Sequence, residues 1–205
     1  MRVFVIRHAE SDFNRNGLIQ GSMDSKLTRL GAKQAYLLAE ELKPHDLDFI
    51  FSSPASRAYL TAQSIAVPRS IPVAVVPGLR EREYGIYEGK SLVETKKARP
   101  ELFATGSLEL NLEAKPKDGE SLTQVASRVV PFIKRLKTHL KKKVIAIVAH
   151  GIVNKVIIAE LTDGDLKKIG TYKQSNACIN EILFEKGKGK AIRLNYTGHL
   201  ESLEH

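Results

Sequence analysis

The sequence has one cysteine and no long apolar run. Because Cys178 is alone among 205 residues, no disulfide can form within the chain, which suits a reducing compartment. No apolar stretch has the length of a membrane-spanning helix, and the N-terminus lacks the apolar region of a secretory signal. These absences predict a cytoplasmic protein with no membrane partner.

Aromatic residues are also scarce, at 6% of the chain, although the formal net charge is +9. Lysines cluster at residues 141–143 and 186–190 without aromatic residues between them. Nucleic-acid binding could explain such runs, but the aromatic platforms on which bases stack are missing. We therefore interpret the runs as a solvated helix end and a hairpin turn, and expect no nucleic-acid partner. An excess of basic over acidic residues also suits a protein with a small anionic substrate.

The length and composition are typical of one globular domain, with 42% hydrophobic and 27% charged residues. The chain contains no internal repeat and no long linker. We expect a single domain over residues 1–202. Residues 203–205 (Leu-Glu-His) resemble the start of an expression tag and are left out of the fold prediction.

Three short apolar runs, residues 3–6, 47–51 and 144–149, lack the polar alternation of a half-exposed strand. Continuous apolar runs are typical of strands covered on both faces, as in a parallel sheet. Residues 178–184 and 191–196, joined by a Gly/Lys turn, predict a final hairpin.

Helical patterns lie between these strands. Thr28 is expected to cap a helix whose inner face carries Ala32, Ala35, Ala39 and Leu42. Ser53 and Pro54 predict an N-cap and first turn, and Ser121 with Gln124 predicts a capping box. Pro131 should kink the helix that this box opens. Together, these strands and helices predict an α/β three-layer sandwich, with a mostly parallel central sheet and helices on both faces.

Each apolar run is followed by arginine or histidine. Arg7 and His8 follow the first run, Arg57 comes soon after the second, and His150 follows the third. Ligands of open α/β sheets bind beyond the carboxyl ends of the strands. Two arginines that converge there could clamp a phosphate through bidentate hydrogen bonds. Alternatively, Arg57 could pair with a surface carboxylate, and this choice stays open.

His8 could be a nucleophile, a metal ligand or a structural histidine. Zinc needs three or four ligands, and the paired Cys or His spacings are missing, so no metal site is predicted. A neutral imidazole can attack phosphorus and form a phosphohistidine, while a protonated His150 nearby would stabilise the charge on the transferring oxygens. The Gly-rich loop of nucleotide-binding enzymes is absent, and no arginine closely follows Cys178 as in cysteine phosphatases.

Five motifs, taken together, resemble the histidine phosphatase (phosphoglycerate mutase-like) superfamily. They are RHAESDFN (7–14), QGSMDSKLT (20–28), SSPASRAYLTA (52–62), LREREYGIYEG (79–89) and VAHG (148–151). The motifs occur in the family's order over roughly the first three quarters of the chain. Ala9 is the main departure, because the family usually has glycine there.

The resemblance implies a role for each matching residue and implies no cofactor. His8 matches the phosphorylated nucleophile, and Glu81 matches the proton donor to the leaving oxygen. The family counts this acid four residues before Gly85, which selects Glu81 over its neighbour Glu83. Arg7, Arg57 and His150 match the residues around the phosphoryl group, and the substrate-binding positions are Asn14, Gln20, Gly21, Tyr84 and Gly151.

The resemblance also favours the phosphatase branch over the mutases. Mutases of this family usually carry a long insertion that covers the site, whereas only 38 residues, positions 82–119, separate Glu81 from Glu120 here. A shorter cover leaves the phosphohistidine open to water. Parts of the chain resemble the metal-independent phosphoserine phosphatases, although that branch often has histidine at the position of Tyr84.

The expected activity is hydrolysis of a small phosphorylated metabolite through a phosphohistidine. A phosphoglycerate mutase and a non-catalytic protein that binds a phosphorylated ligand are the alternatives, and a colorimetric phosphatase assay would separate the second from an enzyme. A homodimer is an open alternative to a monomer.

Overall fold

The computed structural model describes residues 1–103 and 110–203. Its six-stranded sheet has the order β3-β2-β4-β1-β5-β6. Neighbours among the first four strands of this order are parallel, and β5 runs antiparallel to both β1 and β6. The bounds are β1 (Arg2–Arg7), β2 (Phe49–Ser52), β3 (Val73–Val75), β4 (Val144–Ala149), β5 (Ile179–Glu185) and β6 (Lys188–Tyr196).

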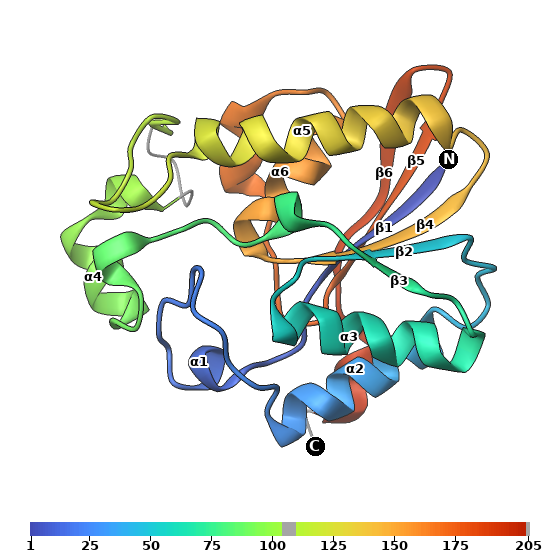
Figure 1. The fold of residues 1–205 in the computed structure, drawn as a ribbon, viewed down its shortest axis with the longest axis horizontal. Helices are drawn as coiled ribbons and strands as arrows, with labels where there is room; N and C mark the ends of the chain where they lie inside the picture. Colours follow the sequence, from blue (N-terminus) through green and yellow to red (C-terminus); the bar gives the residue numbers. More distant parts are fainter. Residues whose placement is uncertain (104–109, 204–205) are drawn as a thin grey trace.

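Helices cover both faces of the sheet, as Figure 1 shows. The helices α5 (Leu122–His139) and α6 (Gly151–Leu161) lie on one face, and α2 (Arg29–Glu41) and α3 (Ser56–Ala66) lie on the other. The short helices α1 (Asp12–Arg15) and α4 (Leu92–Ala98) belong to loops at one end of the sheet. The 3-10 turns are η1 (Val67–Arg69), η2 (Pro77–Leu79), η3 (Gly85–Tyr87), η4 (Pro100–Leu102), η5 (Leu166–Thr171) and η6 (Gly198–Leu203).

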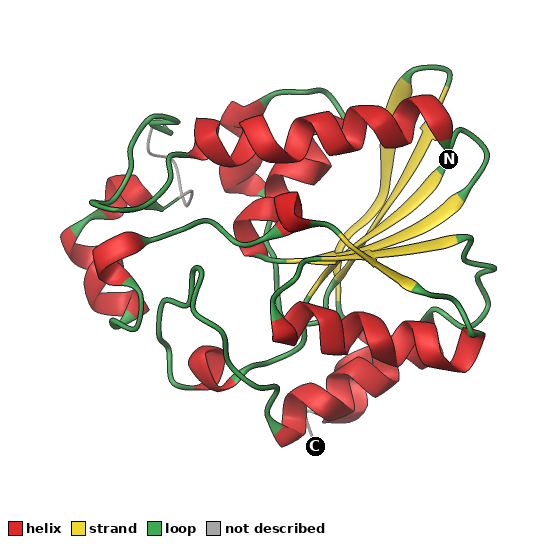
Figure 2. Cartoon of the chain, in the orientation of Figure 1, coloured by secondary structure: helices red, strands yellow, loops and turns green. Residues whose placement is uncertain are grey.

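The core has two halves because successive side chains of a strand point to opposite faces. In β1, Val3 and Val5 pack with α5 and α6, whereas Phe4 and Ile6 pack with α2 and α3. All four side chains are fully buried, which explains the continuous apolar run. The predicted three-layer sandwich is confirmed, and Figure 2 shows the strands between the helices.

Most of the predicted helix signals are confirmed. The Thr28 hydroxyl accepts a hydrogen bond from the Gly31 amide at 2.9 Å, and Ser121 with Gln124 forms the capping box of α5. Helix α5 continues through Pro131 to His139. The final hairpin also forms, with β5 paired to β6.

Three details of the prediction are wrong. Strand β2 begins at Phe49, two residues later than expected. Ala32 is exposed, because the buried stripe of α2 is formed by Ala35, Leu38 and Ala39 and continues to Leu42. The N-cap of α3 is Ala55 rather than Ser53, because the Ser53 amide still donates to the Val148 carbonyl and keeps Ser53 beside β4.

The C-terminal residues form part of this packing. Leu203 ends η6 and packs, partly buried, against a small cluster that includes Ala35 and Leu200. The other two residues of the expected tag, 204 and 205, lie outside the described residues. Over the described ranges, no helix is long and apolar enough to cross a membrane.

Candidate active site

The carboxyl ends of β2, β4 and β1 lie side by side, because these strands are neighbours in the sheet. Arg7 ends β1 and His8 follows it, His150 stands between β4 and α6, and Arg57 lies in the first turn of α3. A cavity of about 130 Å³ lies at this end. It is lined by Arg7, His8, Asn14, Leu18, Ile19, Gln20, Gly21, Arg57, Glu81, Tyr84, Leu92 and Phe103.

His8 is buried and its ring has a defined tautomer. Its Nδ1 lies 2.8 Å from the Ala9 carbonyl oxygen. A carbonyl only accepts, so Nδ1 carries the proton and Nε2 keeps its lone pair. Burial holds the pKa of His8 well below its usual value, and the charges of Arg7 and Arg57 lower it further. His8 is therefore neutral near pH 7, as a nucleophile must be.

The two arginines are held by backbone carbonyls. The Arg57 guanidinium donates to Met23 and Gly21 at 2.9 and 3.0 Å, and Arg7 donates to Gln174 at 2.6 Å. Burial lowers the pKa of both side chains. Their Nε atoms are buried and have no hydrogen-bond partner among the described residues. Buried N–H donors without acceptors are costly, so a bound anion would relieve this cost.

The alternative interpretation, that Arg57 pairs with a carboxylate at the surface, is only partly correct. Its Nη1 lies 3.6 Å from Asp24 Oδ1, but only 1% of the Arg57 side chain is exposed. The guanidinium therefore belongs to the buried wall of the cavity. The dipole of α3 disfavours a cation in the first turn, which a bound anion would also compensate.

His150 lies behind His8, with ring centroids 5.2 Å apart. Its Nε2 is 2.7 Å from the Ser53 hydroxyl, and the oxygen of that hydroxyl accepts a hydrogen bond from the Ala55 amide at 3.3 Å. Its Nδ1 is buried without a partner in the described part of the chain. Burial, together with Arg57 and His8, holds the pKa of His150 well below its usual value. This environment favours the neutral ring over the protonated form that the sequence left as a possibility.

Glu81 reaches the cavity from the loop after η2. Its Oε1 accepts from the Arg82 amide at 2.9 Å, and its Oε2 accepts from the Ile152 amide at 3.4 Å. Gly151 borders this carboxylate rather than the cavity, since a Cβ there would lie 3.6 Å from Oε2. Glu83 instead pairs with Arg80 at 3.2 Å. Glu81, and not Glu83, therefore shares the lining of the cavity with His8.

The other predicted substrate positions, Asn14, Gln20, Gly21 and Tyr84, line the cavity. Gly21 has φ +53°, and a Cβ there would lie 2.1 Å from Glu88 Oε1, so the position requires glycine. Tyr84 stacks on Phe103 at 5.7 Å, and burial raises the pKa of its hydroxyl to about 12.

Sequence reasoning missed two kinds of residue. The apolar lining residues Leu18, Ile19, Leu92 and Phe103 lie in loops or a short helix, where a single apolar residue has no distinctive pattern. Ser53 was assigned to a helix cap, but its hydroxyl bonds His150. The available signal was the position of Ser53, directly after a strand whose carboxyl end lies at the site. No group of three or more His, Cys, Asp or Glu side chains within residues 1–103 and 110–203 could hold a metal ion.

The family model "histidine phosphatase superfamily (branch 1)" matches residues 3–197. The chain belongs to this superfamily. It is 32% identical over 200 residues to phosphoserine phosphatase 1 of Hydrogenobacter thermophilus, covering 98% of this chain and 94% of that one. It is 29% identical over 203 residues to the metal-independent phosphoserine phosphatase of Arabidopsis thaliana, and the match covers 98% of this chain and 84% of that one.

The fold of the enzyme also matches solved structures of phosphatases. A mycobacterial glucosyl-3-phosphoglycerate phosphatase, solved with VO3, superposes with a TM-score of 0.84 at 25% identity. The match covers 96% of this chain and 99% of that one. The protein is therefore a phosphatase of this superfamily, as the motifs predicted.

Proposed function

We propose that this histidine phosphatase hydrolyses small phosphomonoesters and that His8 carries the phosphoryl group between two steps. One observation supports this most directly: the Nδ1 contact with the Ala9 carbonyl leaves Nε2 unprotonated, in a cavity lined by the buried Arg57 and the half-buried Arg7. An unprotonated nitrogen beside cations that bind phosphate is the arrangement that attack on phosphorus needs.

In the first step, His8 Nε2 attacks phosphorus while the bond to the ester oxygen breaks. Glu81 gives its proton to that oxygen, and the alcohol leaves. In the second step, Glu81 takes a proton from water, the water oxygen attacks phosphorus, and the phosphorus–nitrogen bond breaks. Inorganic phosphate leaves, and His8 and Glu81 return to their starting states.

The remaining polar groups would stabilise the charge on the transferring oxygens. At this site, Nε of Arg7, Nε of Arg57 and Nδ1 of His150 have no hydrogen-bond partner within residues 1–103 and 110–203. If the Ser53 hydroxyl donates to His150 Nε2, the proton of the neutral ring sits on Nδ1 and can be donated to a phosphoryl oxygen. In this proposal His150 acts as a neutral donor, without the protonation that we considered from the sequence.

The substrate is proposed to be a compact phosphorylated metabolite. A cavity of about 130 Å³ has room for a phosphate and a few further atoms. Phosphoserine is a candidate because two relatives are named for it. Tyr84 and the apolar residue Phe103 would contact the part of the substrate beyond the phosphate.

We further propose that the enzyme works in the cytoplasm, where its buried thiol, Cys178, would stay reduced. A homodimer is likewise a proposal, which sedimentation equilibrium would test.

Trapping the intermediate tests the mechanism. Quenching with detergent at alkaline pH during turnover of a ³²P-labelled ester should leave label on the wild type that is stable in base and is released when the protein is later treated with acid. The label should be absent from His8→Ala and retained in His139→Ala, which alters an exposed histidine. Full activity in His8→Ala would overturn the mechanism.

The mutase alternative needs its own assay. The enzyme is given 3-phosphoglycerate with catalytic 2,3-bisphosphoglycerate, and separately a panel of esters that includes phosphoserine. We expect phosphate release from at least one ester and slow isomerisation. Rapid isomerisation with negligible phosphate release from every ester would contradict hydrolysis as the main activity.

A further inference from the structure

A second, larger cavity lies at the other end of the sheet from His8. It has a volume of about 670 Å³ and lies where β1 and β4 begin and β5 ends. We call it the basic groove. Its lining residues are Met1, Arg2, Lys137, Lys141, Lys142, Lys143, Val144, Leu183, Phe184, Glu185, Lys186 and Gly187.

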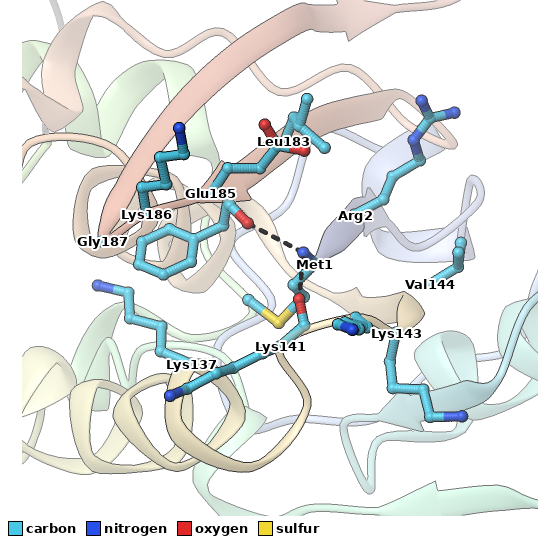
Figure 3. Close-up of a pocket in the computed structure, with 12 residues that line it drawn as sticks. Met1, Arg2, Lys137, Lys141, Lys143, Val144, Leu183, Glu185, Lys186 and Gly187 are labelled. Atoms are coloured by element: carbon cyan, nitrogen blue, oxygen red, sulfur yellow. Dashed lines mark hydrogen bonds between the residues drawn. The ribbon is translucent and has the colours of Figure 1, made fainter.

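The fold brings the lysines of residues 141–143 and the first lysine of the 186–190 run to this groove. Residues 141–143 lie in the connection from α5 to β4, whereas Lys186 lies in the turn between β5 and β6. Lys137 of α5 and Arg2 of β1 add two further cations. Figure 3 shows the labelled cations arranged around Met1. Lysines from two runs that appeared unrelated in the sequence therefore form one positively charged site.

Some of these charges already have partners. Lys137 pairs with Glu160 and Lys143 with Asp48, each at 2.7 Å. Arg2 lies 3.5 Å from Glu181.

Three other lysines of the basic groove have no such partner in the described part of the chain. Among the described residues, no hydrogen bond or ion pair involves the side chains of Lys141, Lys142 and Lys186. Glu185 is the one acidic residue in the lining, so the basic groove keeps an excess of positive charge.

Hydrogen bonds of the Met1 ammonium hold the groove in shape, and part of its lining is apolar. The Met1 ammonium donates to the carbonyls of Lys141 and Phe184 at 2.6 and 2.9 Å, which joins the connection between α5 and β4 to β5. The Lys137 ammonium lies 5.2 Å from the centre of the Phe184 ring. Val144 and Leu183, both half-buried, also line the groove. A lining of apolar side chains among separated cations suits a ligand with both an apolar body and anionic groups.

We propose that the basic groove is a binding site, separate from the active site, for a small molecule with several phosphate charges and an apolar or aromatic body. Its volume lies within the range of about 300–1,000 Å³ typical of small-molecule sites. Like charges gathered in a concave site focus their field and attract multivalent anions. A monoanionic metabolite would leave most of this positive charge uncompensated.

Calorimetry on the full-length enzyme tests the site, with orthovanadate added first to occupy the active site. The probe is the non-hydrolysable nucleotide AMP-PNP, which has several phosphate charges and an aromatic body. We expect saturable binding at low salt that weakens strongly at high salt, because exposed charges are screened. Because binding is the readout, the result does not depend on the proposed catalytic mechanism.

A pair of matched variants separates the groove from general charge attraction. Lys141→Glu/Lys186→Glu changes one residue of each run, and Lys33→Glu/Lys167→Glu makes the same change in net charge at exposed positions elsewhere. We expect the first variant to weaken binding at least about tenfold and the second by less than about twofold. Equal weakening in both variants, or no binding to the wild type at low salt, would overturn the proposal.

Discussion

The substitution Arg82→Met tests how the loop that carries Glu81 is held to later parts of the chain. Arg82 has no exposed surface, although it directly follows Glu81 in a loop. Its guanidinium donates to three carbonyls, those of Leu102 at 2.6 Å, Ala114 at 2.8 Å and Glu120 at 2.8 Å. One side chain thereby ties both ends of the segment between η4 and α5 to the loop that carries the proposed acid.

The size of the effect follows from these bonds. Methionine keeps much of the volume but leaves three carbonyls without their donor. A hydrogen bond to a charged group contributes about 1.5–3 kcal/mol, and removing the buried charge returns part of its desolvation cost. We therefore expect the free energy of unfolding to fall by about 3–5 kcal/mol.

Arg80→Met is the matched control. Arg80 is two residues away and 42% exposed, and it pairs with Glu83 and Glu120 at 3.2 Å each. Exposed pairs contribute about 1 kcal/mol or less, so this variant should stay close to the wild type. Urea unfolding followed by circular dichroism measures both variants. If Arg82→Met lost no more stability than Arg80→Met, the proposed role of Arg82 would be wrong.

Three further outcomes are expected. Glu81→Gln should slow esters with poor leaving groups by about 10²–10⁴-fold and p-nitrophenyl phosphate much less, whereas Glu83→Gln should show no such dependence; the reverse pattern would reassign the acid. Because the pKa values of His8 and His150 are lowered, the unfolded chain binds more protons below its histidine pKa of 6.5. Urea titrations should therefore show that the free energy of unfolding falls as pH drops below 6.5, by up to about 1.4 kcal/mol per pH unit for each histidine. The substitution His8→Asn should reduce this slope, and an unchanged slope would contradict a buried neutral His8 ring. Activity should survive dialysis against EDTA, and a loss restored by Mg²⁺ or Zn²⁺ would contradict metal-independent catalysis.

The sequence predicted the sheet and the location of the site because those signals are local. A strand buried on both faces must be apolar throughout, so β1 and β4 were visible as continuous runs. Arg7, His8 and His150 directly follow those runs, and the carboxyl ends of parallel strands share one edge of the sheet. Pattern and position together therefore identified these three residues.

Other features depended on contacts between residues far apart in the chain. Periodicity could not show that Ser53 bonds His150, 97 residues away, or that Arg82 holds carbonyls from a later segment. The choice between Glu81 and Glu83 needed the family's spacing, and the tertiary structure alone shows the amide of α6 that binds Glu81. The basic groove has the same origin, since its lysines meet only because β5 returns beside β1. Local sequence determines which segments can be strands and which residues end them, whereas strand pairing and packing determine which of those ends and loops come together.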